Sequence, residues 1–69
     1  MFTIRYSTED CRGRPYFSSY TADNIKDANE IFKTVCSSLR SDYYANRYSK
    51  FEVWLMSEDI LLDKYGLSD

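Results

Sequence analysis

Apolar and polar residues alternate at the start of the chain. In residues 1–8, Phe2, Ile4 and Tyr6 are separated by polar side chains, which is the two-residue period of a half-buried strand. The polar residues 9–15 hold the only proline and one of the two glycines, so we expect a loop there. Residues 16–20 then predict a second, shorter strand, whose register the pattern leaves open.

The middle of the chain has the repeat of an amphipathic helix. Apolar residues recur at intervals of three and four and form one stripe, which consists of Ile25, Ala28, Ile31, Phe32, Val35, Cys36 and Leu39. The pattern predicts a helix over residues 22–40. Thr21 is the expected N-cap, because a threonine side chain can accept a hydrogen bond from a free N–H of the first turn.

The last third of the chain predicts a second pair of strands. Residues 41–49 have no clear period and are expected to form a connection. Residues 51–56 alternate as in a strand, residues 57–59 form a short turn, and residues 60–65 return as a final strand that ends at Gly66. The order of elements is therefore strand, strand, helix, strand, strand.

This order predicts an α+β fold in a single domain of residues 1–69. Two hairpins and one helix favour a ββαββ arrangement, in which a four-stranded antiparallel sheet carries the helix on one of its faces. A chain of 69 residues has room for one hydrophobic core and no second domain.

One helix can cover only one face of such a sheet. If Phe51, Val53 and Leu55 face the helix, the period of two places Trp54 and Met56 on the opposite face. According to its register, the final strand adds one of two pairs to that face, either Leu61 and Tyr65 or Ile60 and Leu62. Exposed apolar patches of this kind often mark contact sites, so we expect Trp54 and Met56 to belong to a docking surface.

Two features of the chain could cover that face instead. The aliphatic stems of Arg5, Glu52 and Lys64 could lie over the indole of Trp54, or residues 41–49 could fold across it. If the face stays open, its contact is with another chain. A homodimer and a foreign partner both fit the pattern.

Residues that commonly carry catalysis are scarce. The chain has no histidine, which excludes Ser-His and Cys-His nucleophile pairs and histidine-ligated metals. Its two cysteines lack the spacing of a structural zinc site, and no glycine-rich phosphate loop is present. Cys36 lies on the apolar stripe, whereas Cys11 lies in a polar loop where Arg12 and Arg14 could favour a thiolate. We expect a protein that is not an enzyme and that uses no metal or cofactor.

Charge and composition narrow the class of partner. The net charge of −2 is far from the basic stripe of a duplex-DNA binder, so duplex DNA is not an expected partner. No apolar run is long enough for a signal peptide or a membrane span. With Met1 and without an export signal, the chain is expected in a cytoplasm, where Cys11 and Cys36 stay reduced.

Two segments have the composition of recognition surfaces. Aromatic residues make up 17% of the chain, and several gather beside an arginine in the expected connection, namely Tyr43, Tyr44, Arg47 and Tyr48. Tyrosine gives a large contact area with few rotatable bonds, and arginine anchors carboxylates or phosphates. Arg12 and Arg14 in the first loop could reach an acidic partner. The same tyrosines could instead stack on single-stranded bases, with nearby basic residues at the phosphates.

The chain is short and acidic, and it has a strand pair before the segment TADNIKDANEIFKTV and ends in the hairpin FEVWLMSEDILLDKYG. In these features it resembles the small inhibitor proteins that bacteriophages encode, including anti-CRISPR proteins. The resemblance covers the whole chain in outline and includes no specific motif, so it transfers no site residue. It implies a stoichiometric inhibitor that blocks a surface of a larger host complex in the host cytoplasm.

These features predict a small protein–protein interaction module that acts without turnover. The expected contact residues are Trp54, Met56, Tyr43, Tyr44, Arg47, Tyr48, Arg12 and Arg14. A single-stranded nucleic-acid binder that uses the tyrosines is the alternative, and a structural homo-oligomer is a third hypothesis.

Overall fold

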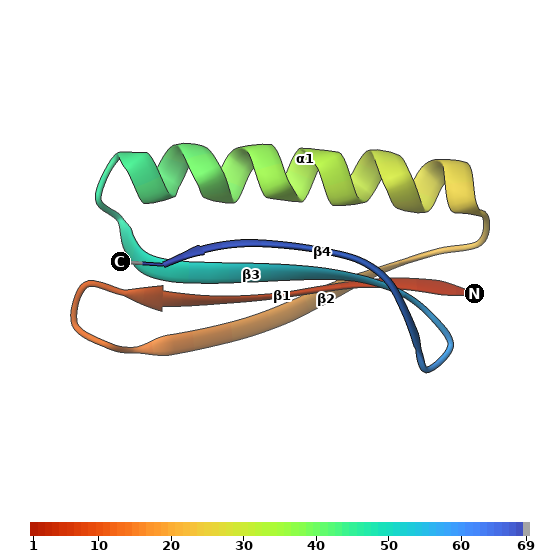
Figure 1. Ribbon diagram of the computed structural model, residues 1–69, viewed down its shortest axis with the longest axis horizontal. Coiled ribbons are helices and arrows are strands. Elements are labelled where there is room, and N and C mark those ends of the chain that lie inside the picture. Colours follow the sequence, from red (N-terminus) through yellow and green to blue (C-terminus); the bar gives the residue numbers. More distant parts are fainter. Residues whose placement is uncertain (69) are drawn as a thin grey trace.

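A computed structural model describes residues 1–68 of the chain. Within these residues, four strands form one antiparallel sheet and one helix lies along a single face of it (Figure 1). The elements follow one another as β1 (Phe2–Asp10), β2 (Pro15–Ala22), α1 (Ile25–Tyr44), β3 (Tyr48–Ser57) and β4 (Ile60–Ser68). The prediction of an α+β, ββαββ fold is confirmed.

The first and third strands occupy the middle of the sheet, whose order is β2-β1-β3-β4. Each hairpin therefore contributes one central strand and one edge strand. In the central pair, Ile4 lies opposite Leu55 and Tyr6 lies opposite Val53. Because directly opposed residues share a face of the sheet, the alternating apolar residues of β1 and β3 point to the same side, which is the side of the helix.

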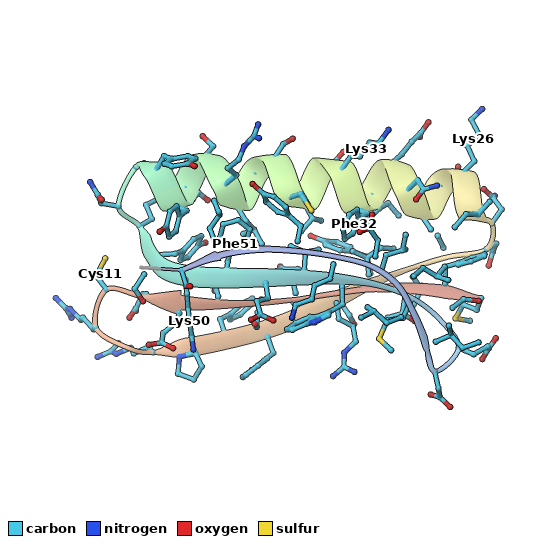
Figure 2. The ribbon with its side chains drawn as sticks, in the orientation of Figure 1. Cys11, Lys26, Phe32, Lys33, Lys50 and Phe51 are labelled. Atoms are coloured by element: carbon cyan, nitrogen blue, oxygen red, sulfur yellow. The ribbon has the colours of Figure 1, made fainter. Side chains whose placement is uncertain are left out.

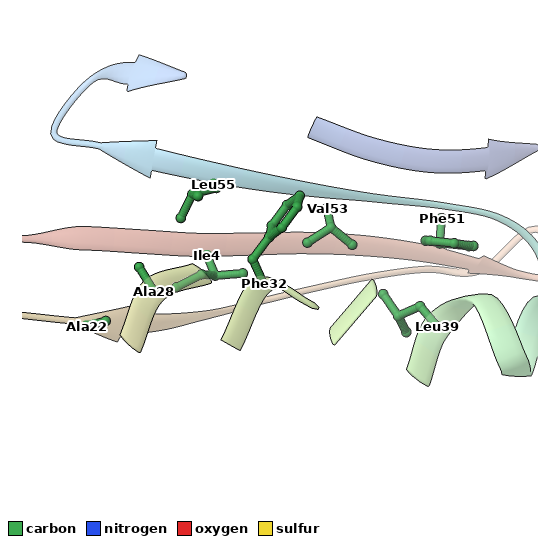
Figure 3. Close-up of a cluster of buried hydrophobic side chains, with 8 residues drawn as sticks. All are labelled: Ile4, Ala22, Ala28, Phe32, Leu39, Phe51, Val53 and Leu55. Atoms are coloured by element: carbon green, nitrogen blue, oxygen red, sulfur yellow. The ribbon is translucent and has the colours of Figure 1, made fainter. Parts of the chain in front are cut away.

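The hydrophobic core lies between α1 and the sheet. Figure 3 shows its buried side chains, which are Ile4, Ala22, Ala28, Phe32, Leu39, Phe51, Val53 and Leu55. α1 packs mainly against β3, and Phe32 and Phe51 fill the space between them, whereas Lys26 and Lys33 point away from the sheet (Figure 2). The apolar stripe of the helix thus faces the apolar side of the central strands, as its period predicts.

The dimensions of the elements explain what the helix covers. α1 has 20 residues and is about 30 Å long, and the nine residues of β1 extend over about the same length. In width, a helix of about 10 Å covers roughly two strands spaced about 4.8 Å apart, and not four. On β2, the helix-side residues Tyr16 and Tyr20 consequently stay exposed.

The helix begins later than predicted, at Ile25, and its N-cap is Asn24 instead of Thr21. The Asp27 backbone N–H donates to the Asn24 side-chain oxygen at 2.9 Å, and the Asn24 amide donates to the Asp27 carboxylate at 3.1 Å. Thr21 belongs to β2, where it lies opposite Thr3. Pairing with β1 thus extends β2 through Thr21, although threonine is a residue type that is favoured as an N-cap.

The helix also ends later than predicted, at Tyr44 instead of residue 40. Its end is a Schellman motif. The Arg47 N–H donates to the Asp42 carbonyl at 3.0 Å, and the Asn46 N–H donates to the Tyr43 carbonyl at the same distance. Asn46 has a φ of 64°, the left-handed conformation that asparagine tolerates at this position. The predicted connection is therefore reduced to a tight turn between α1 and β3.

The loop predicted over residues 9–15 is shorter in the structure, because β1 extends to Asp10 and β2 begins at Pro15. The carboxylate of Asp10 organises the turn by accepting the backbone N–H of Arg14 at 2.9 Å and that of Arg12 at 2.8 Å. The hydrogen bond from Arg14 has the largest effect on its ionisation, and with the one from Arg12 it holds the pKa of Asp10 below the ordinary value.

Candidate docking face

The face of the sheet opposite α1 is covered by no other element of residues 1–68, and we call it the open face (Figure 1). Every second residue of the strands lies on it. From β2 to β4 these residues include Phe17, Ser19, Thr21, Thr3, Arg5, Ser7, Glu9, Lys50, Glu52, Trp54, Met56, Leu61, Lys64 and Gly66.

Trp54 and Met56 lie on the open face, and both side chains are partly buried. Trp54 lies between its two cross-strand partners, Arg5 of β1 and Lys64 of β4. Residues 41–49 do not fold across it, because they form the end of α1, the following turn and the start of β3. Trp54 is thus neither enclosed in the core nor fully exposed to solvent.

The last strand follows neither of the two predicted registers. Leu61 lies opposite Met56 on the open face, whereas Tyr65 lies opposite Val53 on the helix side. The register shifts between Leu55 and Met56, so that the alternation of β4 inverts along the strand. Such irregularities bend a strand pair, and the β3–β4 turn lies on the side of the sheet away from α1 (Figure 1).

The middle of the open face contains an open depression of about 500 Å³. We call it the docking groove, and its lining includes Arg5, Phe17, Ser19, Trp54, Met56 and Leu61. Phe17 and Leu61 come from the two edge strands and are 72% and 50% exposed. Trp54 and Met56 come from the central strand β3. The groove therefore has apolar side chains on both sides and in its middle.

Within the described part of the chain, the charged residues of the open face form ion pairs, with one exception. Lys50 lies 3.4 Å from Glu9, and Lys64 lies 3.7 Å from Glu52; Lys50 points away from α1 (Figure 2). Arg5, beside Trp54 in the docking groove, is exposed and has no carboxylate oxygen within 4.0 Å in the described part of the chain. Although the chain has a net charge of −2, a cation that is unpaired within residues 1–68 thus lies in the apolar centre of this face.

The remaining predicted contact residues lie elsewhere. They gather where α1 ends and β1 turns into β2, at one end of the molecule, and comprise Arg12, Arg14, Tyr43, Tyr44, Arg47 and Tyr48. The Cys11 thiol joins the two segments by donating to the Asn46 carbonyl at 3.0 Å. Along the extended β3, Tyr48 and Trp54 are roughly 20 Å apart. The structure therefore divides the predicted contact residues between two separate surfaces.

The fold itself engages most of the tyrosines at that end. The Tyr43 ring meets Phe51 edge-on, with 5.9 Å between ring centroids, and contacts Tyr44 at 5.4 Å. Tyr48 is partly buried, and this burial, together with the negative charge of Asp42, raises its pKa. Of these three tyrosines, only Tyr44 is largely exposed, at 69%. One exposed ring is a poor platform for the successive base stacking that single-stranded nucleic acid requires.

The sequence pattern did not identify Phe17 and Arg5 as residues of the docking groove. The register of β2 is set by its pairing with β1, which places Phe17 opposite Ser7 on the open face; the short segment alone has no clear alternation. Arg5 was expected only as a cover for Trp54. Arg5 is distinguished by having no carboxylate partner within residues 1–68. This property depends on which side chains the fold brings near Arg5, so the sequence pattern does not reveal it.

The other chemistry-bearing residues are dispersed. Among the described residues, no group of three or more Cys, Asp or Glu side chains is placed to hold a metal ion. Cys11 and Cys36 are free thiols, and burial, with the nearby charge of Asp63, raises the pKa of Cys36 to about 11. Within residues 1–68, no helix has the length and the apolar character needed to cross a membrane.

Comparison of the chain with protein-family models, with curated proteins and with solved structures found no match.

Proposed function

We propose that this chain is a small, non-catalytic binding module that docks onto a protein partner through its open face. The observation that supports the proposal is the docking groove, in which Phe17, Trp54, Met56 and Leu61 present apolar surface around an open depression. Exposed apolar surface is costly to leave in water, and contiguous exposed apolar patches often mark contact sites.

The mode of action that we propose is stoichiometric inhibition or modulation of a larger host complex in the host cytoplasm, of the phage anti-defence or anti-CRISPR kind. It rests on the resemblance of the chain in outline to such inhibitors. A standard interface buries about 800 Å² on each partner, which is roughly a sixth of the 4854 Å² surface of the molecule. A module of this size can therefore block a site on a larger protein simply by occupying it.

Two matched substitutions test the proposal. Phe17→Ser removes an exposed aromatic ring from the docking groove, and Tyr44→Ser removes a similarly exposed ring from the other predicted surface (72% and 69% exposed). Neither side chain is in the core, so both variants should keep the circular dichroism spectrum of the parent. Parent and variants are immobilised, an extract of the host cell is passed over each, and bound proteins are quantified by mass spectrometry.

We expect one protein or complex to be retained by the parent and by Tyr44→Ser and to be lost with Phe17→Ser. The purified partner should rebind in a fixed molar ratio. Loss with Tyr44→Ser alone would move the contact to the end of the molecule where α1 terminates. Equal retention by both variants would contradict docking through the open face.

A further inference from the structure

We propose that the partner presents a carboxylate, surrounded by apolar side chains, to Arg5 in the docking groove. This inference rests on the proposed function and adds the chemistry of the partner to it. The occupant is a segment of a different protein that places one Asp or Glu among apolar residues.

Arg5 determines which group the partner must present, because docking would remove the Arg5 guanidinium from water. Its neighbours across the open face are Trp54 and Ser19, and neither carries a charge. The diagonal carboxylate of Glu52 is engaged by Lys64 at 3.7 Å. Covering a guanidinium with apolar atoms alone is strongly unfavourable. A carboxylate from the partner relieves this, since it can accept two parallel N–H bonds from the planar guanidinium.

A second copy of the chain would bring the wrong charge to the groove. In a two-fold dimer the same patch of both subunits meets, and residues near the axis contact their own counterparts. Two Arg5 side chains would then approach each other within an apolar interface. On the open face of residues 1–68, the strand residues Glu9 and Glu52 are both already paired with lysines, so the strands of a second copy offer no free carboxylate to receive Arg5.

A nucleic-acid strand fits the groove less well than a protein segment does. Single strands bind along a track of cations, with bases stacked on aromatic rings. On the open face, Lys50 and Lys64 are paired with carboxylates, and Arg5 is the one positive charge left isolated among the described residues there. Met56 and Leu61 in the lining are aliphatic and cannot stack bases. An isolated cation among aliphatic and aromatic side chains matches one carboxylate among apolar residues.

A library of random peptides provides a probe that does not require the natural partner. Peptides are selected on the full chain, and those that bind Phe17→Ser equally well are discarded. The affinity of each remaining peptide is then measured by fluorescence anisotropy for the parent, Arg5→Met and Arg12→Met. Methionine keeps a long apolar stem and removes the charge. Arg12 lies in the β1–β2 turn outside the groove and serves as the matched control.

We expect the selected peptides to share an Asp or Glu flanked by apolar residues. Arg5→Met should weaken their binding at least about tenfold, and Arg12→Met by less than about twofold. Changing the peptide carboxylate to an amide should weaken binding to the parent by a similar factor. The same change should have little further effect on Arg5→Met, because two groups that interact directly are not additive.

The alternatives give different results. Peptides that depend on Phe17 but lack an acidic residue, or that are insensitive to Arg5→Met, would overturn the inference and leave the proposed function intact. A dimer in sedimentation that Phe17→Ser dissociates would assign the groove to a second copy, and labelled oligothymidine bound through Arg5 would assign it to nucleic acid; each overturns the inference. If no peptide depends on Phe17, the proposed function fails as well.

Discussion

Individual side chains in this protein are constrained by close contacts between strands and turns. A Cβ added at Gly66 would lie 2.7 Å from the carbonyl oxygen of Phe51, so β4 can approach β3 only with glycine at this position. Asp10 accepts the N–H groups of Arg12 and Arg14 and thereby closes the β1–β2 turn. Neither constraint produces a periodic pattern in the sequence. Each depends on the positions of backbone atoms, which only the folded structure defines.

Asp10→Asn should remove the part of the pH dependence of the free energy of unfolding that comes from the Asp10 carboxylate. The backbone hydrogen bonds from Arg14 and Arg12 lower the pKa of Asp10 from its ordinary 3.8, so the native state binds fewer protons than the unfolded state around this pH. The stabilisation is therefore fully present above pH 3.8 and is lost as the pH falls through the lower native pKa. An NMR titration of the Asp10 carboxyl carbon measures that pKa, and urea unfolding compares parent and variant at neutral and acid pH. A native pKa at or above 3.8 would contradict the account.

At the scale of elements, the periodicity of the sequence identified the helix, the strands and their order, but not their ends. The ends depend on contacts between elements, such as the pairing of Thr21 with Thr3 that extends β2. Part of the missing information was present in the sequence. Tyr43 continues the apolar stripe one turn beyond Leu39 and packs on Phe51. Asn46 is a residue type that commonly ends helices in the left-handed conformation.

The N-cap of α1 can be tested by itself. Asn24→Ala removes the acceptor for the Asp27 N–H and should lower the free energy of unfolding by about 1 kcal/mol. Asn24→Asp keeps an acceptor and adds a negative charge at the N-terminus of the helix, which is favourable there, so its stability should stay close to that of the parent. Urea unfolding followed by circular dichroism measures both. Equal losses in the two variants would mean that the cap contributes little.

For the whole molecule, the number of elements determines that one face of the sheet is left open. One helix of roughly two strand widths lies on one side of the sheet, and the other side is the open face; this could be predicted from the sequence. The position of the groove could not, because it depends on the strand order and on the register shift in the β3–β4 hairpin. These two features place Phe17 and Leu61 on either side of Trp54.

Substitutions on opposite faces of β3 should therefore have different consequences. Phe51 is 1% exposed under α1, and Phe51→Ala should cost about 3–5 kcal/mol, close to the whole stability of a small domain. Trp54 is only partly buried, so Trp54→Ala should mainly remove its interactions with the cross-strand partners Arg5 and Lys64, at a cost of about 1 kcal/mol. Trp54→Ala should thus keep its fold in urea unfolding and lose partner binding, whereas Phe51→Ala should lose both. If Trp54→Ala unfolds as readily as Phe51→Ala, the indole is part of the core, and the open face is not a docking surface.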